Sequence, residues 1–205
     1  MGEIISASHD VVFKALFVRN PDILRAFLRD ILDLPITDND KITILNPELI
    51  PDFSEGKLSR LDIHVEMKNR RFNIEMQARK NGFSAERVLY YWAELYSEKF
   101  ESGGKYEELE QTISVNVLGF KFLNCENYHS SYSILEDSRY EKFTDKQSIH
   151  VFELLKVPKE IISGDAKQQW MRNSLIIFFE EEFLIPNTSV YYYAINHDIR
   201  QSIYY

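Results

Sequence analysis

The sequence predicts a mixed α/β fold, a β-sheet flanked by α-helices. Apolar residues repeat at helical spacing before residue 35, alternate at strand spacing between residues 61 and 78, and return to helical spacing after residue 84. Helices and strands in this order favour a layered architecture over an all-helical or all-β one. The 205 residues are enough for one large domain with its own core.

The N-terminal part predicts two helices and one short strand. Ser8 is a typical N-cap for the first helix, and Asn20 followed by Pro21 combines a cap with proline at the first position of the second. The second helix continues at helical spacing until Pro35, and a strand is expected near residues 41–45. Both helices carry an apolar stripe that must be buried against another layer.

The middle of the chain predicts a β-hairpin. Apolar residues occupy every odd position in 61–67 and every even position in 72–78, which is strand alternation. The connection is short and polar, and the simplest hairpin pairs Lys68 with Arg71. This register places six polar residues on one face: Asp62, His64, Glu66, Asn73, Glu75 and Gln77. The apolar face is expected to pack on a helix.

After the hairpin we expect a helix that begins near Ser84 and is stopped by Gly103-Gly104. Further strands are expected at residues 112–120, 132–135 and 149–155. Beyond Trp170 the pattern is lost. We therefore expect one domain over residues 1–170 and an atypical C-terminal tail over residues 171–205.

Composition excludes several classes of protein. The single cysteine, Cys125, excludes an internal disulfide framework and a zinc site built from several thiolates. No apolar run approaches the roughly 20 residues that span a bilayer, and no secretory leader is readable. These features predict a soluble, cytoplasmic protein without a membrane partner.

Charge is unevenly distributed. The net charge of −8 argues against a protein that binds nucleic acid over its whole surface, but residues 57–87 hold eight basic and four acidic side chains, a local balance of +4. The rest of the chain therefore carries −12. A positive site for a phosphate-bearing substrate is one interpretation, and chance variation in a short window is the other.

Two carboxylates on the polar face form a candidate metal site. In the expected register Asp62 and Glu75 are diagonal neighbours, with Cβ atoms about 7–8 Å apart. Their oxygens can converge on one hard cation such as Mg²⁺. The alternative is an edge hairpin whose polar face is merely wetted by solvent, with His64 a surface or supporting residue rather than a ligand.

A family resemblance favours the metal site. Asp62, twelve intervening residues and then Glu75-Met76-Gln77 is similar to the Asp…Glu-x-Lys core of PD-(D/E)XK nucleases, with glutamine in the lysine position. Over about residues 8–172 the chain resembles the bacterial recombination-promoting nucleases, a transposase-like family of this superfamily; residues 171–205 do not. The segments that carry the resemblance, in order, are Asp10-Val-Val-Phe-Lys14, Leu45-Asn-Pro-Glu48, Lys57-Leu-Ser-Arg-Leu-Asp62-Ile63, Asn73-Ile-Glu-Met-Gln77, Arg87…Tyr91, Gly104-Lys-Tyr106 and His150-Val-Phe-Glu-Leu-Leu-Lys156.

The resemblance implies a restriction-endonuclease-like core and a metal-dependent DNA endonuclease that hydrolyses phosphodiester bonds in recombination or transposition. Asp62, Glu75 and the backbone carbonyl of Met76 would hold Mg²⁺ or Mn²⁺. Glu48 would add a carboxylate through a bound water or, equally, stabilise a turn. Gln77 would orient the attacking water without supplying the positive charge of lysine.

The resemblance also implies DNA contacts from Lys57, Arg79, Arg87 and Tyr91, although an ordinary polar helix stripe explains the last two equally well. The matching residues His150, Glu153 and Lys156 are better explained as parts of a structural strand. Two rival functions stay open: a nuclease-derived DNA- or protein-binding module that cuts weakly, and a structural or interaction protein. A homodimer is also compatible with the sequence.

Overall fold

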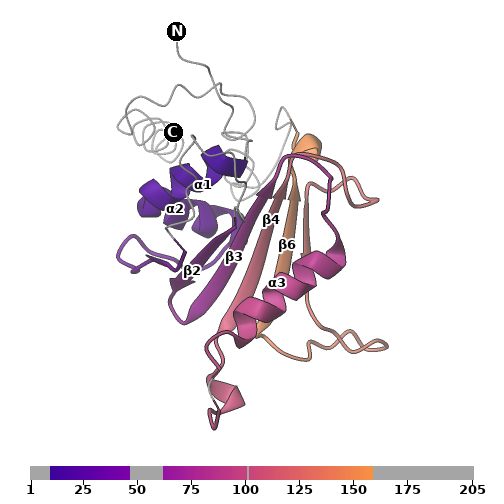
Figure 1. Ribbon diagram of the computed structural model, residues 1–205. Helices are drawn as coiled ribbons and strands as arrows, with labels where there is room; N and C mark the ends of the chain where they lie inside the picture. The colour runs from indigo at the N-terminus through magenta and orange to yellow at the C-terminus, as the bar shows by residue number, and fades with distance from the viewer. Residues whose placement is uncertain (1–9, 47–61, 101, 159–205) are drawn as a thin grey trace, which may run out of the picture.

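The computed structural model describes residues 10–46, 62–100 and 102–158; the remaining residues, including the expected tail, lie outside these ranges. A six-stranded mixed sheet has helices on both faces (Figure 1), which is the restriction-endonuclease-like α/β architecture that the sequence predicts. No helix within the described residues is long and apolar enough to cross a membrane.

The sheet has the strand order β1-β2-β3-β4-β6-β5. The inner strands β3, β4 and β6 run parallel, whereas β1, β2 and β5 are each antiparallel to their neighbours. Parallel strands need a crossover connection, and α3 supplies it between β3 and β4. The strands are β1 (Thr43–Ile44), β2 (Ile63–Met67), β3 (Arg70–Gln77), β4 (Gln111–Leu118), β5 (His129–Tyr132) and β6 (Gln147–Glu153).

Helices α1 (Asp10–Arg19) and α2 (Pro21–Leu32) cover one face of the sheet. Pro21 stands at the start of α2, as expected, and Asp33 ends it in the left-handed conformation with φ 54°. The apolar face of the hairpin packs against these helices, which confirms its predicted orientation. The main core combines both layers: Phe13, Phe17, Leu24, Phe27, Leu28, Ile31, Ile63, Val65, Met67, Phe72, Ile74, Met76, Ile113, Val115, Val117 and Phe152 are among its buried members.

Helix α3 (Ala85–Ser97) covers the opposite face (Figure 1). Ser84 is its N-cap, as predicted, because its side chain accepts a hydrogen bond from the Arg87 amide at 3.2 Å. Trp92 donates its indole N–H to the Thr112 carbonyl at 2.9 Å, which fixes the helix against β4. A smaller apolar cluster lies on this face: Phe83, Val88, Leu118, Ile149 and Val151.

The register of the hairpin differs from the expected one by two residues. Met67 pairs with Arg70, and only Lys68 and Asn69 form the turn. Both turn residues have positive φ, 52° and 57°, as a two-residue type I′ turn requires, and the twist of that turn matches the twist of the strands. The shift by an even number preserves which residues share a face.

The hairpin does not lie at the edge of the sheet, and its polar face is not simply wetted. β1 covers the outer side of β2, and β3 is a central strand. On the α3 side Asn73 is 1% exposed and Glu75 7% exposed. Burial of these groups beneath a helix contradicts the interpretation of a solvated edge hairpin.

The strands near the C-terminal end of the domain begin earlier than their alternation indicates. β5 lies at residues 129–132 rather than 132–135, and β6 begins at Gln147 rather than near residue 149. Short 3₁₀ helices, η2 (Tyr106–Glu108) and η3 (Leu154–Lys156), follow α3 and β6. Single turns of this kind have no apolar period that a sequence pattern can reveal.

Glu153 and Lys156 form a buried structural clamp, in agreement with the structural interpretation of this motif. Lys156 donates to Glu153 at 2.6 Å, and their side chains are 5% and 1% exposed. The Glu153 carboxylate also accepts from the amides of Phe122 and Leu123. The pair therefore holds the loop after β4 against the end of β6.

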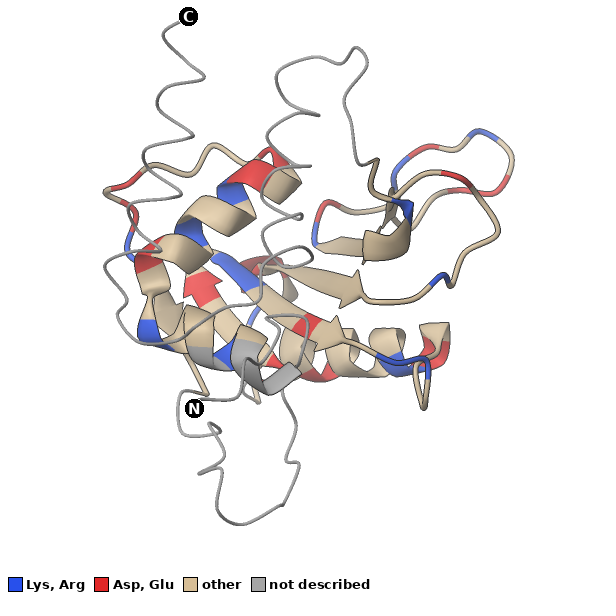
Figure 2. Ribbon diagram, turned by 90° about the horizontal axis from the view of Figure 1, so that it is seen from above, with Lys and Arg blue, Asp and Glu red and all other residues tan. Residues whose placement is uncertain are grey.

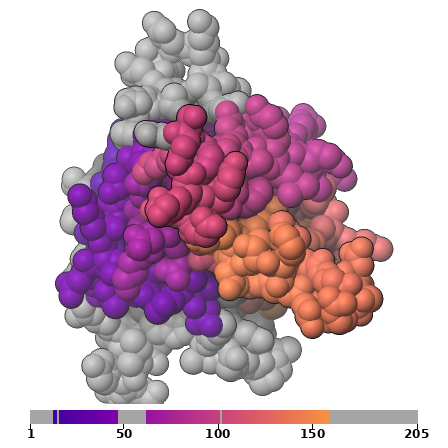
Figure 3. Space-filling view, turned by 90° about the horizontal axis from the view of Figure 1, so that it is seen from below, coloured from indigo at the N-terminus to yellow at the C-terminus, as the bar shows by residue number. Residues whose placement is uncertain are grey.

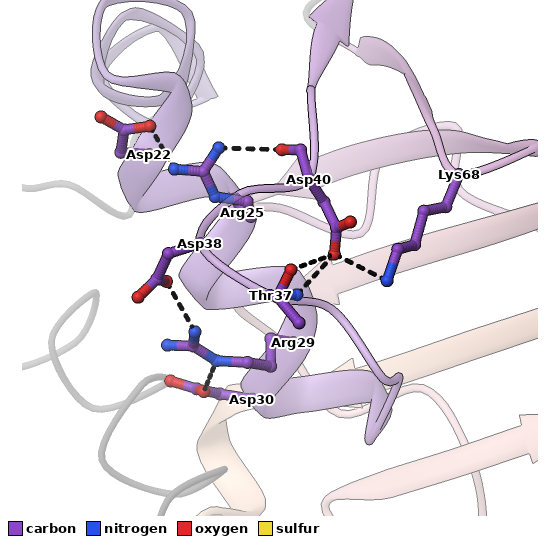
Figure 4. A network of polar contacts seen from close by, with 8 residues as sticks. All are labelled: Asp22, Arg25, Arg29, Asp30, Thr37, Asp38, Asp40 and Lys68. Carbon is purple, nitrogen blue, oxygen red and sulfur yellow. Dashed lines mark hydrogen bonds and ion pairs between the residues drawn. The ribbon is translucent and has the colours of Figure 1, made fainter.

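A polar network ties α2 to the hairpin turn (Figure 4). Arg25 donates to Asp22 and to the Asp40 carbonyl, and the Asp40 carboxylate accepts from Lys68 at 2.9 Å. The bonds from Lys68 and Thr37 lower the pKa of Asp40 to about 2. The exposed Lys68 side chain is thus paired with a carboxylate, which offsets its positive charge.

In the view from above, basic and acidic residues are interspersed over the described elements (Figure 2). At the end of the molecule seen from below, the segment near residue 105 lies between the N-terminal part and the segment near residues 140–150 (Figure 3). The carboxyl ends of the parallel strands, and with them the predicted site, lie at the other end (Figure 1).

Candidate active site

The predicted carboxylates lie closer than the sequence indicates. The observed register pairs Ile63 with Ile74, and its continuation by one residue places Asp62 directly opposite Glu75. Directly opposed Cβ atoms are about 4.5–5.5 Å apart, against about 7–8 Å for the expected diagonal pair. The side chains are 10% and 9% exposed. Two nearly buried carboxylates therefore occupy adjacent positions, a geometry suited to a shared cation.

Three neighbours hold Asp62. Its backbone carbonyl accepts hydrogen bonds from Lys14 Nζ and from Asn46 Nδ2, both at 3.0 Å. Its carboxylate Oδ2 lies 2.9 Å from His64 Nε2. Asn46 Oδ1 also accepts a hydrogen bond from the His64 amide at 2.9 Å, so the Asn46 side chain binds the backbone of both Asp62 and His64. The aspartate is fixed before any ligand arrives.

The pKa of Asp62 is shifted by opposing effects. Burial raises it, but the hydrogen bond and charge of His64, with a contribution from Lys14, outweigh burial and lower the pKa below its usual value. Asp62 therefore carries its negative charge at neutral pH. The Lys14 side chain is fully buried, and burial lowers its pKa although the Asp62 charge opposes the shift.

Glu75 is paired with a cation from α3. Arg87 Nη2 lies 2.8 Å from Glu75 Oε1. Arg87 is held further by a 3.3 Å hydrogen bond to the Gly82 carbonyl and lies over the Tyr91 ring at 5.4 Å. The resemblance implies DNA contacts from Arg87 and Tyr91; the structure places Arg87 beside the predicted metal ligand Glu75, and Tyr91 beside Arg87.

Gln77 lies on the same face as Glu75, at the end of β3. Its amide nitrogen donates to the Asn81 carbonyl at 3.0 Å, which fixes the orientation of the amide. Its oxygen Oε1 is buried and has no hydrogen-bond partner among the described residues. A lysine could offer only donors at this position, whereas Gln77 offers an acceptor.

A buried polar layer continues from Glu75 into β4. Asn116 is the direct neighbour of Glu75 in the parallel register and is fully buried. It donates to Ser114 and to the His150 carbonyl, both at 3.1 Å, while its oxygen has no partner within the described ranges. Asn73 likewise has a buried oxygen without such a partner. The sequence pattern does not reveal this layer, because a polar residue within a strand gives no sign of whether it is buried or exposed.

The remaining predicted site residues are only partly placed. Glu48 and Lys57 lie outside the described residues. Arg79 is exposed on the loop between β3 and α3. The Met76 side chain packs in the main core, so only its backbone carbonyl is available to a metal.

The locally positive window does not form a basic patch on the described surface. Arg71 is buried and binds the Leu95 carbonyl and Glu98 near the end of α3, and Arg70 donates to Gln111. Arg87 and Lys68 have acidic partners as well. Four of the six described basic residues of the window therefore have partners within the protein, whereas Arg79 and Lys80 are exposed on the loop before α3.

The donor set fits a hard divalent cation that keeps part of its water shell. Among the described residues there is no group of three or more His, Cys, Asp or Glu side chains that could hold a metal. Mg²⁺ typically uses one or two carboxylates and several waters, and Mn²⁺ also suits oxygen ligands. Asp62 and Glu75 meet this requirement.

The mixed sheet and its flanking helices define the class: a restriction-endonuclease-like α/β protein. The chain belongs to a family described as PD-(D/E)XK nuclease family transposase, whose model matches residues 7–174. Comparison with curated proteins finds no significant match, and comparison with solved structures finds none either. PD-(D/E)XK nucleases generally use divalent metals, and a nuclease family implies DNA as substrate.

Proposed function

We propose that this protein is an endodeoxyribonuclease that uses Mg²⁺ or Mn²⁺ to hydrolyse phosphodiester bonds, in DNA recombination or transposition. The observation that carries the proposal is the opposition of Asp62 and Glu75 on the α3 face, next to Gln77. Family membership supports a nuclease-like role, and the buried carboxylates supply the chemistry that such a role needs.

The contacts of Asp62 and Glu75 support their roles, and the family resemblance suggests those of Glu48 and Lys57. Asp62 and Glu75 would bind the metal, with the Met76 carbonyl as a third oxygen and Glu48 as a further ligand through water. When bound, the cation would polarise a water and neutralise charge on the phosphate. His64 and Lys14 keep Asp62 ionised and in place.

Gln77 would orient the attacking water. Its amide nitrogen already donates a hydrogen bond to the Asn81 carbonyl, so its oxygen is the atom that would accept a hydrogen bond from that water. An amide is not a base, so the proton would pass to bulk solvent or to the phosphate rather than to Gln77. Arg79 and Lys57 would contact the DNA backbone, which contributes affinity without sequence information.

Plasmid nicking in the presence of Mg²⁺, Mn²⁺ or a chelator tests the proposal. The full chain should nick supercoiled DNA with either metal and not with chelator, and Asp62→Asn should abolish nicking. Asp38→Asn is the matched control, because Asp38 is an 86% exposed carboxylate on the α2–β1 loop. Nicking by Asp62→Asn at the parental rate would refute the proposal that Asp62 binds the catalytic metal.

A weakly cutting binding module is the second candidate, since glutamine replaces the usual lysine at Gln77. It predicts salt-dependent DNA binding by the parent protein and by Asp62→Asn alike, with no metal-dependent nicking by either. Absence of both nicking and binding would instead favour an interaction protein.

A further inference from the structure

We infer that Arg87 couples metal binding to DNA binding: it neutralises Glu75 in the absence of a divalent cation and turns to a DNA phosphate when a cation takes its place. This inference rests on the proposed function and assigns a regulatory role within the same site. Under this inference the contact between Arg87 and DNA is not permanent but forms only when the metal is bound.

The first step is the position of the guanidinium. Arg87 Nη2 donates to Glu75 Oε1 at 2.8 Å, and the Glu75 side chain is 9% exposed. A carboxylate at that level of burial needs a cationic partner, because an uncompensated buried charge is strongly destabilising. In this structure Arg87 is a cation that meets the need.

The second step is competition for Glu75. A divalent cation bound between Asp62 and Glu75 supplies the same compensation with twice the charge. It also repels a guanidinium that stays in hydrogen-bonding distance of the same carboxylate. The Arg87 pair and the metal therefore oppose each other, and each should weaken the other.

The third step is that Arg87 is able to leave. Its side chain is 36% exposed, whereas that of Glu75 is nearly buried. Its other contacts are a long hydrogen bond of 3.3 Å to the Gly82 carbonyl and the Tyr91 ring at 5.4 Å. Its Nε is buried and lacks a hydrogen-bond partner among the described residues. Without Glu75, little in this part of the structure holds the guanidinium inward.

The fourth step is the destination. A guanidinium binds phosphate in two parallel hydrogen bonds, and a nuclease must place a phosphate at its metal. Arg87 stands in the first turn of α3, next to the exposed loop that carries Arg79. Because Arg87 contacts the proposed metal ligand Glu75, a released guanidinium would remain beside the metal site, where the substrate phosphate must bind.

The coupling has two measurable signs. Arg87→Gln removes the competitor, so calorimetric titration should show Mn²⁺ affinity raised by about tenfold. In the parent protein, Ca²⁺ should tighten binding of a short labelled duplex relative to chelator, followed by fluorescence anisotropy. In Arg87→Gln this tightening should be largely lost. A purely structural role for Arg87 predicts lower or unchanged metal affinity.

Lys80→Gln is the matched control, because it removes one positive charge from the exposed loop beside α3 without touching Glu75. It should leave Mn²⁺ affinity and the Ca²⁺ effect on DNA binding essentially unchanged. Unchanged or weaker Mn²⁺ binding by Arg87→Gln would overturn the inference while leaving the metal site intact. Absence of Mn²⁺ binding by the parent protein would overturn the proposed function and the inference together.

Thermal melting covers the case in which Arg87→Gln is too unstable for titration. Without added metal its melting temperature should lie below that of the parent, because Glu75 has lost a cation. Addition of Mn²⁺ should raise the melting temperature more in the variant than in the parent, since at a given Mn²⁺ concentration the tighter-binding protein is stabilised more, by RT ln(1 + [L]/Kd). An equal or smaller rise would contradict the competition.

Discussion

The pH dependence of stability tests how His150 is held where β6 pairs with the edge strand β5. Ser148 Oγ lies 2.8 Å from His150 Nε2, and His129 Nε2 lies 3.0 Å from His150 Nδ1. The three side chains form a hydrogen-bonded row that suits a neutral imidazole. Burial, and then the charge of His129, lowers the pKa of His150 from 6.5 to about 4.

The lowered pKa makes stability depend on pH. The unfolded chain binds a proton at this position near pH 6.5 and the folded protein only near pH 4, so in between the unfolded state holds more protons. The free energy of unfolding should therefore fall as the pH drops from above 6.5 to below 4. A difference of about 2.5 pKa units corresponds to roughly 3 kcal/mol, an upper value because the ring is partly exposed.

Urea unfolding between pH 8 and pH 4 measures this dependence. The parent protein should lose stability over the window, and His150→Gln should lose clearly less over the same window. His150 alternates with Ile149 and Val151, which face α3, so its side chain lies on the sheet face opposite Glu75. The variant should therefore nick DNA at the parental rate. If the free energy of unfolding depended equally on pH in both proteins, His150 would not be the group responsible for the loss of stability.

Further predictions concern the site and two ion pairs. Asp62→Ala should lose metal binding and cleavage together, whereas Gln77→Ala should keep metal binding in calorimetry and slow cleavage by about 10²–10⁴-fold. Gln77→Lys should keep or raise the cleavage rate, since an ammonium adds charge beside the phosphate. Lys156→Met leaves the buried Glu153 without its cation and should cost about 3–5 kcal/mol in urea unfolding; an unchanged midpoint would contradict this. Because the folded pKa of Asp40 is about 2 against 3.8, its contribution to stability should disappear between those pH values, and Asp40→Asn should remove that part of the acid transition.

Local patterns determined which elements form and which faces they bury. Asn20 and Ser84 mark real helix starts, but only Ser84 caps its helix with its side chain, whereas the Asn20 amide donates to the Leu16 carbonyl of α1. Strand alternation in 61–78 correctly divides the hairpin into an apolar and a polar face, because side chains alternate whatever the partner strand is. The family, too, is readable from ordered motifs along the chain.

Tertiary structure decided what the polar face is for. The two-residue turn at Lys68-Asn69 gives a register that differs by two residues from the predicted one, and this register sets Asp62 opposite Glu75. Residue spacing alone does not decide which turn conformation the chain adopts. Burial of Glu75 comes from α3, whose position depends on packing against β4. The partner of Arg87 follows from the same docking, because a side chain on one element acquires a role only when another element brings a charge within hydrogen-bonding distance.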